Sequence, residues 1–255
     1  MRKWNLIITI LLFILGVLCY IFFEVRPITV LDDVLANKLL CNSIARLGLS
    51  LLFGWLLYQF GGHRLMVFER NFPKALLWSL PCFMVALVNF PIVAIINGTA
   101  KIMRTDLIGL YILYVVSIAL LEEFIFRGTL LLVISDYFKR KKHGVFFVVL
   151  ICSLIFSLFH LTNLFEGAGI GATLLQCVYT FLIGAMLMVT IVKTKNIWLC
   201  ILIHALFDFG GLLIIQIGSG NPWDTAFWIM TIASGVLAAG HIIYTLIKLD
   251  KTYVS

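Results

Sequence analysis

Long apolar runs alternate with short polar breaks along the whole chain, and this pattern predicts membrane-spanning helices. An apolar run of about 18 or more residues with few charges can cross the hydrocarbon core of a bilayer as a helix. About eight such runs occur, at residues 4–23, 36–61, 75–98, 106–134, 144–161, 168–192, 197–217 and 225–247. We therefore expect an all-α, polytopic transmembrane helix bundle in which residues 1–255 form a single membrane-embedded domain.

Composition strengthens this picture and excludes an ordinary soluble domain. The chain is 62% hydrophobic and only 12% charged, with a mean hydropathy of +1.10. The first run follows Arg2 and Lys3, as in a secretory signal, but it is too long for a signal and no small-residue cleavage site follows it. We interpret it as a retained first span.

The distribution of basic residues predicts the orientation of the bundle. The net charge is +7, and the basic residues lie mainly in short loops, where a membrane explains them better than nucleic acid does. One alternating set of segments holds thirteen of them, including the cluster at 139–142, whereas the other set holds three, Arg26, Lys101 and Arg104. Because lysine and arginine favour the cytoplasmic side, both termini are expected to be cytoplasmic.

The polar residues that remain inside the spans are the candidates for function, since such residues are costly in hydrocarbon. Lys38 and His241 lie near span ends, where their side chains can reach the membrane surface, and Arg46 can serve as a structural counter-ion. The set comprises Lys38, Arg46, Asn89, Glu122, Glu123, Arg127, His160, His204, Asp208 and His241.

Helical spacing divides these residues into groups. Glu123 and Arg127 are four apart, with the acid first, which favours an ion pair on one face. Glu122 is rotated by ~100° around the same helix and faces elsewhere. His204 and Asp208 are also four apart, so the carboxyl group of Asp208 is predicted to orient the imidazole.

A buried site rich in carboxyl and imidazole groups has two obvious chemistries. A carboxylate can act as the general base on a water molecule, with histidines supplying an acid or stabilising an oxyanion. Alternatively, the same groups can bind a divalent metal such as zinc, which then activates the water. The chain lacks His-Glu-x-x-His and Gly-x-Gly-Asp, and Ser234 with His241 echoes a serine–histidine dyad only faintly.

Three short motifs resemble those of the CPBP family, which comprises the CAAX prenyl endopeptidases and their bacterial Abi-type relatives. The motifs are Glu122-Glu123-x-x-x-Arg127, Phe156-x-x-x-His160 and His204-x-x-x-Asp208, in this order on three apolar spans. The resemblance covers about residues 106–215, which we take as the catalytic core. Each motif alone is common, but their joint occurrence is specific.

The resemblance implies an intramembrane glutamic endopeptidase in the plasma membrane of a bacterium. Glu122 would be the base that activates water and His160 would assist it. His204 and Asp208 would help to hold the oxyanion and position the water. Glu123, Arg127 and Phe156 would support them. Many relatives have asparagine in place of Asp208, and an ionised aspartate cannot donate a hydrogen bond.

The expected partners follow from the same resemblance. They are the lipid bilayer and a peptide or protein substrate near the membrane, either prenylated or carrying a leader peptide, whereas no nucleic acid is expected. No cofactor is expected either, because Arg127 already supplies a positive charge beside the carboxylates; a divalent metal such as zinc is the alternative. The sequence makes no prediction of the oligomeric state.

Two other functional classes stay open at this point. One is a non-catalytic membrane protein for immunity or regulation, which would bind a bacteriocin or a signalling partner. The other is a proton-coupled transporter, because chains of carboxylates and histidines also relay protons. Internal repeats would favour a transporter, and the sequence shows none.

Overall fold

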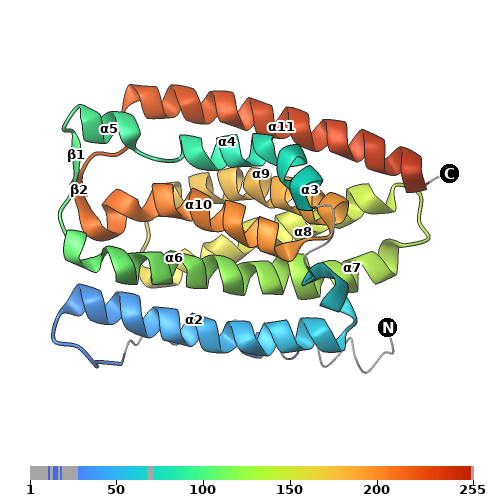
Figure 1. Ribbon diagram of the computed structural model, residues 1–255, viewed down its shortest axis with the longest axis horizontal. Helices are drawn as coiled ribbons and strands as arrows, with labels where there is room; N and C mark the ends of the chain where they lie inside the picture. The colour runs from blue at the N-terminus through green and yellow to red at the C-terminus, as the bar shows by residue number, and fades with distance from the viewer. Residues whose placement is uncertain (1–10, 12–13, 17, 19–27, 68–71, 254–255) are drawn as a thin grey trace.

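The protein is a bundle of apolar helices, shown in a computed structural model that describes residues 11, 14–16, 18, 28–67 and 72–253 (Figure 1). The first expected span, 4–23, falls largely outside these residues. The longer helices are α2 (Val34–Gln59), α6 (Ile108–Glu123), α8 (Gly144–Phe159), α9 (Ile170–Thr194), α10 (Ile197–Ile217) and α11 (Thr225–Tyr253). The shorter elements are η1 (Gly62–Leu65), α3 (Phe72–Trp78), α4 (Leu80–Val88), α5 (Ile92–Ile96), η2 (Thr105–Leu107), η3 (Phe124–Leu130), α7 (Leu131–Phe138) and η4 (His160–Glu166).

The expected class of fold is confirmed, and the described part of the chain refines the number of spans. Six helical segments there are long and apolar enough to cross a membrane, or seven if one bent pair counts as a further span. The long segment at 105–138 joins α6, η3 and α7 without a break in the helix. The side of the membrane on which the termini lie stays a prediction.

The expected span at 75–98 is not one straight helix. It is divided into α3, α4 and α5, and the axis bends by 53° between 72–78 and 80–96. Pro81 stands in the first turn of α4 and Pro91 caps the start of α5. Since proline has no N–H to donate and clashes with the preceding turn, each one starts a new helix more readily than it continues an old one.

A short β-ribbon, which the sequence pattern did not predict, closes one end of the bundle. Strand β1 (Ala100–Ile102) pairs antiparallel with β2 (Gly218–Gly220), with Lys101 opposite Ser219. The backbone oxygen of Ile217 accepts from the N–H groups of Met103 and Arg104 as well. These bonds join the entry to α6 to the end of α10, although more than a hundred residues separate the two strands.

The helices that carry the polar residues lie in the middle of the bundle. Figure 1 shows α2 along one side and α11 along the other, with α6 and α10 between them. Helix α6 packs against both α2 and α10, while α8 packs against α9. A continuous apolar core surrounds the junction of α6 and η3 and extends into α8, α9 and α10. Apolar side chains therefore surround most of this junction.

Candidate active site

A buried ion pair lies where α6 passes into η3. Nη1 of Arg127 donates to Oε1 of Glu123 at 2.8 Å, and both side chains are fully buried. The guanidinium of Arg127 also lies over the ring of Phe156, with 4.1 Å from Cζ to the ring centroid. The contact predicted between Glu123 and Arg127 is therefore present, and an aromatic ring from α8 holds the cation from its other side.

The segment η3 is a π-helix, so the chain is wound more loosely here than in the α-helices on either side. Such π segments are rare and often occur at functional sites. Phe126, within it, packs edge to face against Phe156 and Phe159, with ring centroids 5.0 and 5.5 Å apart. The π-helix thus begins directly after the two glutamates and anchors its aromatic side chain against α8.

His204 joins the ion pair from α10. Its Nδ1 lies 2.7 Å from Oε1 of Glu123, the same oxygen that accepts from Arg127. Because that carboxylate accepts, Nδ1 carries the hydrogen in this arrangement. The predicted pairing of His204 with Asp208 is present at Nε2, but the closest carboxylate is that of Glu123, which holds the ring at Nδ1 from another helix.

The opposite edge of the same imidazole faces two further carboxyl groups. Nε2 of His204 lies 3.4 Å from Oδ2 of Asp208 and 3.7 Å from Oε2 of Glu122. The Glu122 and Asp208 side chains are 10% and 18% exposed, in contrast to the fully buried Glu123. The site thus has a sealed side, which fixes the ring, and a partly open side, on which Glu122 and Asp208 lie.

His160 belongs to the end of α8 rather than to its middle. It caps α8 and begins the 3-10 segment η4, and its Nδ1 lies 2.9 Å from the backbone oxygen of Phe156. Since a carbonyl oxygen only accepts, Nδ1 donates and a neutral ring presents Nε2 as an acceptor. His160 interacts electrostatically with both Asp208 and His204, so the structure brings it to the same cluster.

Phe156 connects the two histidines and the arginine. Its ring centroid lies 5.0 Å from that of His160 and 6.0 Å from that of His204, edge to face in both pairs. Gly184 on α9 makes room for it, because a Cβ atom at Gly184 would stand 2.9 Å from Cδ1 of Phe156. This close approach explains why a glycine occupies the middle of a buried helix.

Arg46 on α2 is a member of the site for which sequence spacing gave no role beyond that of a counter-ion. It is 3% exposed, and its guanidinium lies 4.5 Å from the ring centroid of Tyr114 on α6. It interacts electrostatically with Glu122 and Asp208. An arginine inside a span indicates a buried partner, because the charge is costly in hydrocarbon without one. The partners of Arg46 lie on other helices, so spacing within one helix could not identify them.

Two hydrogen bonds fix the backbone of α10 around Asp208. The side-chain amide of Asn89 donates to the oxygen of Phe207 at 2.7 Å, and the hydroxyl of Tyr111 donates to that of Phe209 at 2.6 Å. Asn89 was a candidate from the sequence, whereas Tyr111 was not. Both side chains hold the helix that presents Asp208 and are positioned to support the site.

The remaining candidates lie elsewhere. His241 packs against Trp78, with ring centroids 4.5 Å apart, and Ser234 donates to the backbone oxygen of Thr231. Lys38 is exposed. Where the structure describes cysteines, Cys41, Cys82, Cys152, Cys177 and Cys200 are free thiols. None of these contacts links the residues to the cluster around His204.

The donors around His204 are of types that can hold a metal, but their arrangement does not match a metal site. Among the residues that the structure describes, no group of three or more His, Cys, Asp and Glu side chains could hold a metal ion. We therefore derive no step of the chemistry through a metal.

Residues 104–210 match the family described as Rce1-like, type II CAAX prenyl endopeptidase. The match spans all three sequence motifs, from Glu122 to Asp208, and leaves α2, with Arg46, outside it. No curated protein and no solved structure matches the chain.

Proposed function

Because residues 104–210 carry the signature of the CAAX protease family, we propose that this protein is an intramembrane endopeptidase of the glutamic type. The observation that carries the proposal is the position of His204. Its Nδ1 is held by Glu123, while its Nε2 faces Glu122 and Asp208 on the partly exposed side of the site. An oriented imidazole beside a separate carboxylate is the arrangement that general acid–base hydrolysis requires.

In the proposed reaction, Glu122 takes a proton from a water molecule as the water oxygen attacks the carbonyl carbon of the scissile peptide bond. The carbonyl oxygen becomes negatively charged, and His204, held by Glu123 at Nδ1 and carrying a second proton on Nε2, donates a hydrogen bond to it from Nε2. The bond between carbon and nitrogen then breaks, and the proton passes to the leaving amine. The products are a carboxylic acid and an amine, so atoms and charge balance.

The other residues of the cluster would set the charge and position of this pair. Arg127 balances Glu123, which lets that carboxylate hold the histidine rather than compete with Glu122. His160 presents Nε2 as an acceptor and can assist in removing the proton from water. Asp208, as a carboxylate 3.4 Å from Nε2 of His204, would act through that ring rather than by donating to the oxyanion.

The substrate we propose is a membrane-proximal peptide or protein segment. Glu122 lies thirteen residues, ~20 Å of helix, before Ser135, and Ser135 precedes the basic cluster at 139–142, which is the predicted cytoplasmic anchor. The site is therefore expected near the middle of the ~30 Å hydrocarbon core, so the substrate segment has to enter the bilayer to reach it. The location we propose is the plasma membrane of a bacterium.

The test is cleavage of membrane-proximal peptides by the purified protein in detergent micelles. We expect Glu122→Gln and His204→Ala to lose at least about a hundredfold in rate, the usual scale for a general base or acid. Asp106→Asn is the matched control, because it makes the same kind of change at an exposed carboxylate near the other end of the helix. Retained cleavage in Glu122→Gln would refute the proposed role.

Chelator and binding measurements distinguish the alternatives. Cleavage that survives chelation supports the metal-independent reaction, whereas loss that added zinc restores assigns the water activation to a metal. If wild type binds a peptide tightly and cleaves none, and Glu122→Gln binds equally well, the protein is a non-catalytic immunity or regulatory factor. Abundance of each variant in the membrane has to be measured in parallel.

A further inference from the structure

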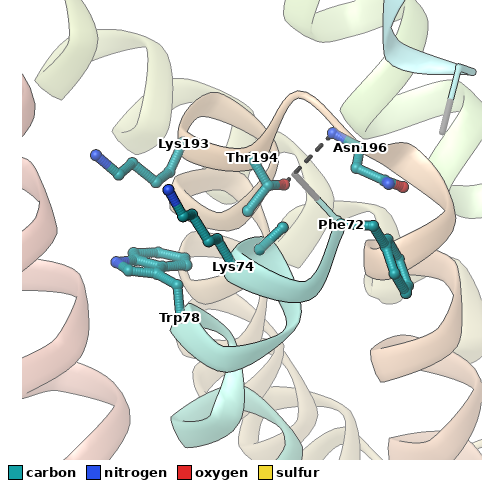
Figure 2. Close-up of a pocket in the computed structure, with 7 residues that line it drawn as sticks. Phe72, Lys74, Trp78, Lys193, Thr194 and Asn196 are labelled. Carbon is teal, nitrogen blue, oxygen red and sulfur yellow. Dashed lines mark hydrogen bonds between the residues drawn. The ribbon is translucent and has the colours of Figure 1, made fainter. Parts of the chain in front are cut away.

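Among the lysines and arginines that the structure describes, Arg46 and Arg127 are the two with buried side chains, at 3% and 0% exposed. Lys74 and Lys193, by contrast, are exposed beside a cavity between α3 and the turn that joins α9 to α10, as Figure 2 shows. A buried cation needs a counter-charge, because apolar surroundings do not replace the water that it loses. Arg127 has Glu123 for this purpose, so the counter-charge of Arg46 has to be identified.

The helix that carries Arg46 supplies no carboxylate. Helix α2 contains no aspartate and no glutamate. Ser43 and Ser50 lie about one turn before and after Arg46 on the same buried face, and their hydroxyls donate to the backbone oxygens of Leu39 and Arg46. The counter-charge of the guanidinium therefore comes from another element.

The side chain of Arg46 is directed towards α6, which packs along α2 (Figure 1). Its guanidinium lies 4.5 Å from the ring centroid of Tyr114, which is 5% exposed. A ring engages the face of a guanidinium, so the N–H groups at its edge can still serve acceptors. Tyr114 precedes Glu122 by eight residues, ~12 Å along the same helix. Arg46 thus contacts the helix that carries the proposed base.

Two carboxyl groups near Arg46 lie at one edge of one imidazole. Oδ2 of Asp208 and Oε2 of Glu122 are 3.4 and 3.7 Å from Nε2 of His204, and carboxylates that share a site in this way repel each other. The charged or titratable groups that interact with Asp208 are His204 on its own helix, Glu122 and Tyr111 on α6, His160 after α8, Tyr179 on α9 and Arg46 on α2. Arg46 is the permanent cation of this set, because a guanidinium keeps its proton in proteins whereas an imidazole changes charge.

We propose that Arg46 is a positioning residue of the active site, which balances the charge of Asp208 so that Glu122 stays ionised as the base. This role rests on the hydrolysis proposed above, in which His204 carries a proton on both nitrogens. The three carboxylates of the cluster are then balanced by three cations, Arg127, His204 and Arg46. Without Arg46, Glu122 and Asp208 would compete for one proton, as neighbouring carboxylates do. The functional site thus extends to α2, outside residues 104–210 of the family match.

The experiment is a double-mutant cycle of Arg46→Met and Asp208→Asn, measured on the full-length protein in detergent micelles with a membrane-proximal peptide as substrate. Arg46→Met is expected to lower kcat by about tenfold or more, because groups in one charged network are coupled by this order of magnitude. KM should stay unchanged, since Arg46 acts on the carboxylates and not on the substrate. In the Asp208→Asn background the same change should lower kcat by less than about threefold. Lys38→Met is the matched control, because it removes a cation from an exposed position of the same helix, and it should change kcat by less than about twofold.

A conservative variant tests whether the charge, rather than the packing of the side chain, is responsible. Arg46→Lys keeps a cation in the same place and should retain most of the kcat that Arg46→Met loses. An equal loss of kcat in the two Asp208 backgrounds would overturn the proposal. So would a raised KM with unchanged kcat, which would assign Arg46 to binding of the substrate instead.

Melting temperatures of the same four proteins separate this proposal from the proposed function. Arg46→Met should lower the melting temperature, and Asp208→Asn should remove part of that loss, because this coupling needs charge and not cleavage. If wild type cleaves no peptide and the coupling is present, the counter-ion is supported and the proposed hydrolysis is refuted. If wild type cleaves and neither readout shows coupling, Arg46 has no such role. Arg46→Gln replaces Arg46→Met throughout if the latter does not accumulate in the membrane.

Discussion

Two arginine–carboxylate clusters with nearly identical contact distances occupy opposite surroundings in this protein. Arg127 meets Glu123 at 2.8 Å with both side chains fully buried. Arg104 meets Asp106 at 2.8 Å and Asp33 at 2.7 Å, but these side chains are 35%, 61% and 41% exposed. Water and salt screen the second cluster and not the first. The buried contact is therefore expected to contribute much more to the stability of the fold than the exposed contacts do.

The buried cluster is also the one that organises further residues. Oε1 of Glu123 accepts from both Arg127 and His204, and the arginine lies over Phe156. Removing any member leaves a charge or a donor without its partner in a place that water does not reach. The exposed cluster holds the start of α2 near the entry to α6, where water can replace each lost contact.

The largest effect is expected from Arg127→Met, which removes the cation beside the buried carboxylate of Glu123 and leaves that carboxylate with His204 but without its arginine. We expect a loss of ~3–5 kcal/mol in the free energy of unfolding, as is usual when one partner of a buried pair is removed. The measurement is denaturant unfolding in detergent micelles. The double variant Glu123→Gln, Arg127→Met removes both charges and should recover part of the loss. If it were no more stable than the single variant, the buried charge would not be the cause.

A smaller loss is expected from Gly184→Ala, which tests how closely α9 must approach the aromatic ring that supports Arg127. The added Cβ would stand 2.9 Å from Phe156 and 3.6 Å from the Cα of Ser153, so the ring or the helix has to shift. Overpacking of this kind typically costs ~1–3 kcal/mol.

Gly171→Ala on the same helix is the matched control, since no atom lies within 4 Å of its Cβ position. It should leave stability unchanged or slightly raised. Both variants are compared by melting temperature and by cleavage rate. Equal effects in the two variants would mean that helix propensity, rather than the contact with Phe156, decides the outcome.

The comparison also shows what the sequence could and could not predict. Apolar runs predicted the spans well, and the run 197–217 coincides with α10, because hydropathy and length are local properties. Spacing of four residues predicted the contact between Glu123 and Arg127, which lie in one helical segment. The π-helix between them changes the winding without separating the two side chains.

Sequence spacing could not predict contacts between residues on different helices. The rule for residues four apart considers only one helix, so it assigned His204 to Asp208. Its closest carboxylate is Glu123, which is 81 residues away in the chain. For the same reason Arg46 was expected to be only a structural counter-ion, since α2 and α6 come together only in the folded bundle. The roles of the site residues in catalysis stay predictions until the variants are assayed.

The exposed cluster predicts a smaller and salt-dependent effect. Arg104→Gln should lower the melting temperature slightly in dilute buffer, because Asp33 and Asp106 then face each other without the cation. At ~1 M salt, where the screening length is ~3 Å, this difference should disappear. The loss in Arg127→Met should persist at the same salt concentration. A salt-dependent loss in both variants would mean that water reaches the buried pair.

The smallest effect is expected from the charge of Asp33, which caps the start of α2. The N–H of Ala36, and then Arg104, lower the pKa of Asp33 from its ordinary value of 3.8, because both stabilise the carboxylate. A carboxyl group with a lowered pKa in the folded state stabilises the fold above its unfolded pKa, and this stabilisation is lost as the pH falls through the folded value. Wild type should therefore be more stable than Asp33→Asn at neutral pH, and the two should converge in acid below the unfolded value of 3.8.

Repeating this comparison in a variant that lacks Arg104 separates the two causes of the lowered pKa of Asp33, the N–H of Ala36 and the arginine. Asparagine still accepts from the N–H of Ala36, so the Asp33→Asn difference isolates the charge and not the cap itself. In an Arg104→Gln background part of the pH dependence should remain, since the bond to Ala36 is the largest single cause of the lowered pKa of Asp33. The readout is the melting temperature between pH 7 and 3. Complete loss of the pH dependence in that background would assign the shift to the arginine alone, and the helix start would then contribute no more than an exposed ion pair does.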